Sequence, residues 1–132
     1  MTPLHRAQFP TVPTSVLIVD DQEDIRILVR ALIRGADDEF AVTGEAANGE
    51  EALAALDNAD PEVIVLDQMM PGMTGLETAR RILERRPGQR ILLFSAYLSD
   101  EIREEAAAVG VTDCLAKDQV ARIADALRAI AA

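Results

Sequence analysis

The sequence is poor in cysteine and aromatic residues, with one cysteine, no tryptophan, one tyrosine and three phenylalanines among 132 residues. Because Cys114 stands alone, no intramolecular disulfide can form, which is typical of chains in reducing compartments. No apolar run approaches the ~18 residues that a membrane-spanning helix requires. The first 14 residues also lack the continuous apolar stretch of a secretory signal. These absences predict a cytoplasmic protein that does not enter a membrane.

Basic residues are also scarce, since 13 Lys and Arg stand against 23 Asp and Glu, giving a formal charge of −10. Phosphate backbones and anionic lipid surfaces repel such a chain, so we expect no direct binding to nucleic acid or membranes. The chain is long enough for one core, because single domains commonly run to ~100–150 residues. We predict a flexible tail over residues 1–14, which hold three prolines and His5, and one domain over 15–132.

Short apolar runs alternate with helical patterns after the tail. Apolar, β-branched runs covered on both faces favour buried strands, and their alternation with helices of ~10–14 residues indicates parallel crossovers. We therefore predict a flavodoxin-like, doubly wound α/β fold. Its five-stranded parallel sheet has the order 2-1-3-4-5, taken from known sheets of this kind, and five helices flank it. The strands are predicted at 16–19, 40–46, 63–66, 91–94 and 112–115, and the helices at 24–34, from 48 onward, at 74–86, at 99–110 and from 118 to the end.

Polar residues follow four of the predicted strands at their carboxyl ends. Asp20 and Asp21 follow the first strand, Asp67 the third, Ser95 the fourth and Lys117 the fifth. In open parallel sheets, ligands bind beyond the carboxyl ends of the strands. The topology therefore predicts that three carboxylates, one hydroxyl and one ammonium group meet at one edge of the sheet.

Clustered carboxylates raise one another's pKa unless a cation lies between them. Oxygen ligands favour Mg²⁺ over Zn²⁺ as that cation. An Asp carboxylate is a competent nucleophile toward phosphorus and gives an acyl phosphate. A metal and Lys117 would neutralise charge on the transferring phosphoryl group, and the Ser95 hydroxyl could donate to one of its oxygens.

Each of these residues also has an ordinary structural explanation. Asp21 or Asp24 could cap the first helix, Ser95 could be a plain strand-end hydroxyl, and Lys117 could be a solvated charge. Asp67 has no comparable cap role, although a loop carboxylate is the simple interpretation. Only the combination, with each residue at the end of a strand, favours a functional site.

The combination resembles the receiver domain of two-component response regulators across nearly all of residues 15–132. Residues 16–21, VLIVDD, are similar to the family's first strand and acidic pair. Residues 63–75, VIVLDQMMPGMTG, are similar to its phosphoacceptor strand and the D-x-x-M-P-x-x-x-G loop after it. Ser95 and Ala96 match the switch hydroxyl and the small residue that follows it, and Lys117 matches the family's lysine.

The resemblance implies that a sensor histidine kinase or phosphotransfer protein phosphorylates Asp67. It also implies Mg²⁺ held by Asp21, Asp67 and the backbone carbonyl of Met69, with Asp20 close by. Phosphorylation would then switch the binding of a downstream protein, of an output domain missing from this chain, or of a second copy as a homodimer. The domain would be no enzyme beyond its own phosphoryl transfer and autodephosphorylation.

Two residues depart from the family's pattern. Asp118 follows Lys117 where receivers usually have proline, so we expect no cis peptide there and predict that Asp118 caps the last helix. Cys114 stands where a rotating Tyr or Phe is common, so the aromatic half of the usual switch is missing. In the family, the positions of Met69 and Tyr97 border the phosphoryl group. We hypothesise that these large side chains slow hydrolysis of the acyl phosphate.

Two other functions remain to be weighed. A phosphatase with an aspartyl nucleophile generally needs a second acid two residues later as proton donor, and Met69 in that place argues against it. A degenerate receiver that acts as a phosphorylation-independent interaction module is the other alternative. Cys114 and Asp118 are the residues that favour it.

Overall fold

The computed structural model describes residues 12–131, so most of the predicted tail, including His5, lies outside the described residues. The first strand, β1 (Thr14–Val19), begins one residue before the predicted start of the domain. Among residues 12–131, no helix has the length and apolar character needed to cross a membrane.

Within the described residues, five parallel strands form one sheet in the order β2-β1-β3-β4-β5, which confirms the predicted 2-1-3-4-5 arrangement. After β1 come β2 (Phe40–Ala46), β3 (Val63–Leu66), β4 (Arg90–Ser95) and β5 (Asp113–Ala116). In the ladders, Val19 pairs with Leu66 and Leu66 with Leu93. The residues after β1 and β3 therefore emerge side by side, while β4 continues to Ser95, which pairs with Ala116 of β5.

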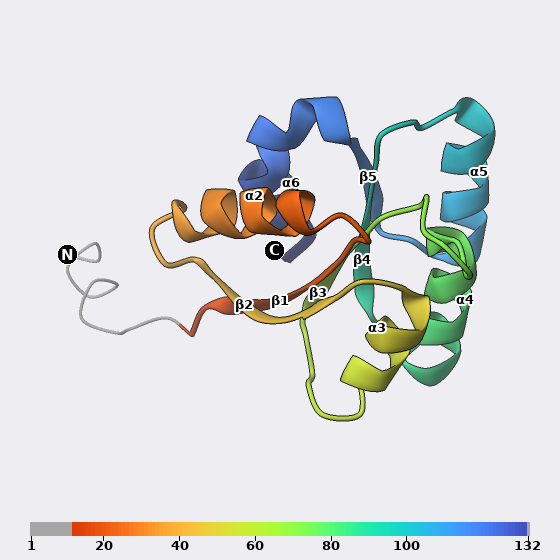
Figure 1. The fold of residues 1–132 in the computed structure, drawn as a ribbon, viewed down its shortest axis with the longest axis horizontal. Coiled ribbons are helices and arrows are strands. Elements are labelled where there is room, and N and C mark those ends of the chain that lie inside the picture. Colours follow the sequence, from red (N-terminus) through yellow and green to blue (C-terminus); the bar gives the residue numbers. More distant parts are fainter. Residues whose placement is uncertain (1–11, 132) are drawn as a thin grey trace, which may run out of the picture.

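Helices cover both faces of the sheet. α2 (Glu23–Arg34) and α6 (Ile123–Ala131) lie on one face, and α3 (Gly49–Ala55), α4 (Gly75–Arg85) and α5 (Asp100–Val109) lie on the other (Figure 1). Alternate strand residues supply the two cores because successive side chains of a strand point to opposite faces. Ile18 and Val65 pack toward α2 and α6, whereas Leu17 and Leu66 pack toward the three other helices.

Several predicted helix ends are confirmed. Gly35 is the C-cap of α2, and the Ser99 hydroxyl caps α5 by accepting a hydrogen bond from the backbone N–H of Ile102 at 3.1 Å. α5 ends at Gly110, whose φ of 106° lies in the left-handed region that glycine adopts without a Cβ penalty.

Two predicted caps are wrong. Gln22 is the N-cap of α2 and its side chain makes no capping bond, so neither Asp21 nor Asp24 caps this helix. Asp24 instead lies in the first turn of α2, where its charge is favourable beside the helix N-terminus.

Asp118 does not cap the last helix either, because it lies inside a 3₁₀ segment, η1 (Lys117–Arg122), that precedes α6. Val120 packs against the core on the α2–α6 side, and Ile123 three residues later is buried in it. Gln119 has non-helical backbone angles (φ −107°, ψ 26°), so the chain kinks there and the regular α-helix begins only at Ile123.

Candidate functional site

Two aspartates lie buried where β1 and β3 end. The backbone N–H of Asp20 donates to the carbonyl of Ala46 at 3.0 Å, and that of Asp67 donates to the carbonyl of Val19 at 2.9 Å. These bonds continue the sheet one residue beyond each strand. Asp20 and Asp67 are only 2% and 3% exposed, whereas Asp21 beside them is exposed. The parallel topology thus brings together residues that are far apart in sequence.

The three aspartates form a cluster that fits a divalent cation. Asp20, Asp21 and Asp67 each offer one carboxylate oxygen, and these oxygens lie within 4.8 Å of one another. Among residues 12–131, Asp20 Oδ2 is a buried oxygen that has no hydrogen-bond partner. Hard oxygen ligands with acceptor capacity to spare suit Mg²⁺, which usually keeps several waters beside one or two carboxylates.

Lys117 reaches the two buried aspartates although Asp118 follows it in place of proline. Its Nζ lies 2.8 Å from Asp20 Oδ2 and 3.4 Å from Asp67 Oδ2. The shorter contact is an ion pair by distance but lacks the angles of a hydrogen bond. The ammonium also lies 6.0 Å from the centroid of the Phe94 ring. As expected, no cis peptide bond occurs among the described residues.

The charges at the site oppose one another. Burial and, after it, the nearby Asp20 charge raise the pKa of Asp67 to about 6, against the opposing effects of Lys117 and the Met69 N–H. The Met69 N–H donates to Asp67 Oδ1 at 3.3 Å. Desolvation and a like charge both disfavour an ionised carboxylate, so one lysine does not offset the crowding of negative charge.

Ser95 is fully buried at the end of β4, and its hydroxyl is the second buried side-chain group without a hydrogen-bond partner in the described part of the chain. Its ladder partner, Ala116, directly precedes Lys117. Buried polar groups are nearly always paired, so the Ser95 hydroxyl has a donor available for a group that binds at the site.

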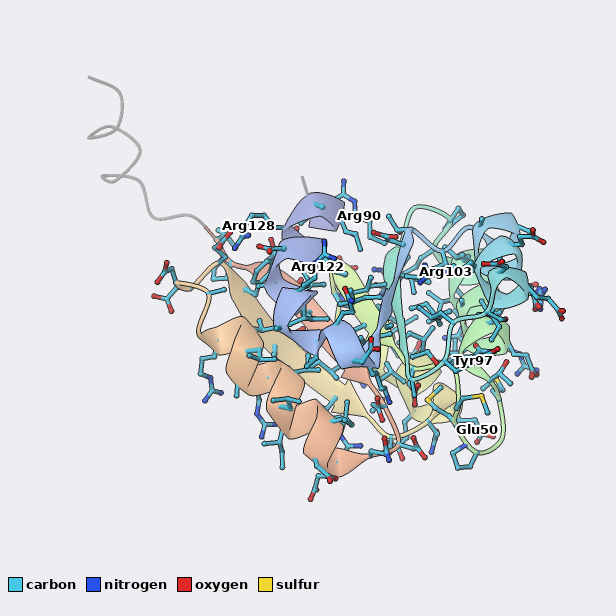
Figure 2. All side chains as sticks on the ribbon, turned by 90° about the horizontal axis from the view of Figure 1, so that it is seen from above. Glu50, Arg90, Tyr97, Arg103, Arg122 and Arg128 are labelled. Carbon is cyan, nitrogen blue, oxygen red and sulfur yellow. The ribbon has the colours of Figure 1, made fainter. Side chains whose placement is uncertain are left out.

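The loops around the site differ in exposure. Met69 and Tyr97 are 66% and 70% exposed, and Tyr97 projects from the loop that follows β4 (Figure 2). Cys114 is half-buried in β5 and packs against the core on the α3–α5 side. The structure thus brings Asp20, Asp21, Asp67 and Lys117 together, as predicted.

Two neighbouring residues were missed from the sequence. Arg26 of α2 donates from Nη1 to the carbonyl of Asp20 at 2.5 Å and from Nε to Glu45 at 3.2 Å. Gln68 is buried directly after Asp67, and its side chain binds the start of α4. Arg26 carries no signal that separates it from other arginines on helix surfaces. Gln68 could have been noticed as a polar residue beside the nucleophile.

The model of the response regulator receiver domain matches residues 16–128. The chain belongs to this family. The receiver is 39% identical over 106 residues to the nitrate/nitrite response regulator NarL of Escherichia coli, covering 80% of this chain and 49% of NarL. It is 33% identical over 113 residues to the chemotaxis protein CheY of Listeria monocytogenes, covering 85% and 93% of the two chains.

A solved structure agrees with these relatives. The signal receiver domain of the putative response regulator NarL from Mycobacterium tuberculosis has a TM-score of 0.84 and 30% identity, covering 92% of this receiver and 98% of that chain. This receiver spans about half the length of the NarL relatives. Receivers of two-component response regulators are typically phosphoproteins that use magnesium, and the acidic cluster described above is where such a metal could bind.

Proposed function

We propose that Asp67 is the phosphoacceptor of this receiver and takes its phosphoryl group from a sensor histidine kinase or a phosphotransfer protein. One observation carries the proposal. The ammonium of Lys117 bridges Asp20 and Asp67 inside a three-carboxylate cluster at the carboxyl ends of neighbouring parallel strands. Such an arrangement is costly unless it serves a ligand, because it buries more negative than positive charge.

The transfer that this geometry supports is a displacement at phosphorus. An ionised carboxylate oxygen of Asp67 attacks the phosphorus of a phosphohistidine, a P–O bond forms and the P–N bond breaks. The histidine nitrogen leaves with the electron pair and takes up a proton. With a pKa of about 6, most of the Asp67 carboxylate is ionised near neutral pH. Lys117 stays beside the developing phosphoryl oxygens, and the unpartnered Ser95 hydroxyl donates to one of them.

In this proposal Asp20, Asp21, Asp67 and the backbone carbonyl of Met69 hold Mg²⁺. When bound, the metal supplies positive charge that stabilises the phosphoryl oxygens during transfer. The residues of the chain hold the nucleophile in place, limit its contact with water through the burial of Asp20 and Asp67, and oppose part of the negative charge through Lys117.

We also propose that residues 15–132 form the receiver unit behind a tail at 1–14. Phosphorylation would favour one arrangement of its surface over another and so switch the binding of a downstream protein, an output domain or a second copy of the chain. Relatives such as NarL are about twice as long as the stretch they share with this chain, which supports an output domain as one of these targets. The domain would act on no separate substrate.

Intact-mass spectrometry after incubation with acetyl phosphate and Mg²⁺ tests the proposal. The wild-type chain should gain one phosphoryl group, and Asp67→Asn should gain none. Asp60→Asn is a suitable control, because the Asp60 side chain is exposed near the opposite end of β3, and this substitution should leave the adduct unchanged. An adduct on Asp67→Asn would overturn the assignment of the acceptor.

The degenerate receiver is the second candidate, and it rests on Cys114. A small, half-buried thiol occupies the place of the rotating aromatic ring, so the usual partner of Ser95 is missing. If neither the wild-type chain nor Asp67→Asn gains an adduct, this second candidate replaces the first.

A further inference from the structure

Gln68 is buried between the phosphoacceptor and the helix that follows its loop. We infer that Gln68 is a positioning residue, which fixes the loop of residues 69–74 in the shape that the metal and the phosphoryl group require. The inference rests on the proposed function of Asp67, and its evidence is the way in which α4 begins.

The first backbone N–H groups of a helix have no partner within the helix and must be satisfied elsewhere. In α4 the first two bind Gln68. The Gly75 N–H donates to the backbone carbonyl of Gln68 at 2.9 Å, and the Leu76 N–H donates to its side-chain Oε1 at 2.8 Å. The third, at Glu77, donates to the Thr74 hydroxyl at 3.2 Å. Gln68 thus serves two of the three, and its side-chain bond is buried.

These bonds close the loop on itself. Gln68 lies just before the loop and accepts hydrogen bonds from Gly75 and Leu76 just after it. These bonds hold the two ends of the loop together. Gly75 also packs so closely on Asp67 that a Cβ at this position would overlap the Asp67 carbonyl oxygen. The first turn of α4 therefore rests directly on the backbone of the phosphoacceptor.

Met69 lies in this closed loop and has one observed and one proposed contact at the site. Its N–H donates to Asp67 Oδ1 at 3.3 Å, and its carbonyl is the proposed metal ligand. Without the Gln68 side chain, the buried Leu76 N–H would lose its partner, and the loop could regain one only by moving or admitting water. Such a shift would misplace Met69, because the other side-chain bonds between the loop and α4, which join Thr74 to Glu77 and Thr78, lie at the far end of the loop.

Substitutions that separate shape from hydrogen bonding test the inference. Gln68→Met keeps the length and bulk of the side chain but removes the acceptor, whereas Gln68→Glu keeps an acceptor oxygen. Thr74→Ala is the matched control, since it also removes an acceptor from the first turn of α4 but at an exposed position. Circular dichroism should show all three variants folded.

The readout is the Kd for Mg²⁺ alone, measured by calorimetry on the unphosphorylated chain. Gln68→Met should raise this Kd about tenfold, in the range found when groups that orient metal ligands are lost. Thr74→Ala should stay within about twofold of the wild-type chain, and Gln68→Glu, which keeps an acceptor and adds negative charge near the cation, should not raise the Kd. Equal weakening in Gln68→Met and Thr74→Ala, no change in Gln68→Met, or a wild-type chain that binds no Mg²⁺ would each overturn the inference.

A second measurement does not depend on the folding of a variant. In the wild-type chain, Mg²⁺ should slow amide hydrogen exchange at Leu76 more than at Glu77, because only the first amide is tied to Gln68. Equal protection of the two amides would count against the positioning role. Phosphorylation of the wild-type chain by acetyl phosphate, run in parallel, shows separately whether the proposed function holds.

Discussion

Removing the Asp67 charge should stabilise the metal-free domain. Asp67 has an ordinary pKa of 3.8, and burial together with the Asp20 charge raises it to about 6 in the folded chain. The folded state therefore holds its proton more tightly than the unfolded state between these two values. Stability falls as pH rises through this window, because ionising Asp67 costs more in the folded chain than in the unfolded one.

The size of the effect follows from the shift. A difference of about 2 pKa units corresponds to about 3 kcal/mol, since one unit equals about 1.4 kcal/mol. Asp67→Asn does not titrate, so its free energy of unfolding minus that of the wild-type chain should grow by up to about 3 kcal/mol between pH 4 and pH 7. Above pH 7 this difference should stay constant.

Urea denaturation followed by circular dichroism measures both free energies, and it suits a chain that has no tryptophan. The buffer must contain EDTA, because bound Mg²⁺ would stabilise the wild-type chain by mass action. Asp57→Asn is a matched control, since its carboxylate is 73% exposed and pairs only loosely with Arg85. If the free energies of unfolding of Asp67→Asn and the wild-type chain differ by the same amount at every pH from 4 to 7, a raised pKa of Asp67 is refuted.

Two further predictions concern the metal and the acyl phosphate. The Kd for Mg²⁺ should fall as pH rises through about 6 and then level off, because the metal must displace the proton of Asp67. Calorimetry at several pH values measures this Kd. A Kd that does not change with pH between 5 and 7.5 would contradict the prediction. Replacing both exposed side chains beside the site, as Met69→Ala and Tyr97→Ala, should speed loss of the phosphoryl group by giving water easier access; an unchanged dephosphorylation rate of the double variant would remove this hypothesis.

The sheet order and the meeting of the acidic residues could be predicted because they depend on a regular pattern. Residues such as 63–66 are apolar throughout, so the strand is buried on both faces and its neighbours must be parallel. Once the strands are parallel, Asp20 and Asp67 must emerge at the same edge. Neither step requires knowledge of a side-chain conformation.

The details of helix starts could not be predicted because several local solutions have similar energies. Asp21 and Asp24 were both plausible caps, yet Gln22 is the N-cap of α2, which begins at Glu23, and Asp20 Oδ1 accepts the Gln22 N–H at 2.9 Å. A capping bond contributes only about 1 kcal/mol, so the placement of Asp20 in the site can override it. At Asp118 the backbone kink at Gln119 instead delays the start of the regular α-helix to Ile123.

The role of the Gln68 side chain was hidden for a different reason. The sequence shows that a polar residue follows Asp67, but the Leu76 amide to which it binds lies eight residues later, beyond a loop that includes Gly72 with a φ of 80°. The return of the chain to Gln68 depends on this turn and on the absence of a side chain at Gly75. Such closure is a property of the folded loop, so composition and periodicity cannot reveal it.

The energetics of the site explain why these details matter. Ionised Asp67 is held against burial and the Asp20 charge by one lysine and one weak backbone bond, and neither Asp20 Oδ2 nor the Ser95 hydroxyl has a hydrogen-bond partner. A bound metal would supply positive charge to the aspartates, and a phosphoryl group would supply an acceptor oxygen for the Ser95 hydroxyl. The metal-free domain would thus give up stability at the residues where we propose that its ligands bind, a trade-off common at functional sites.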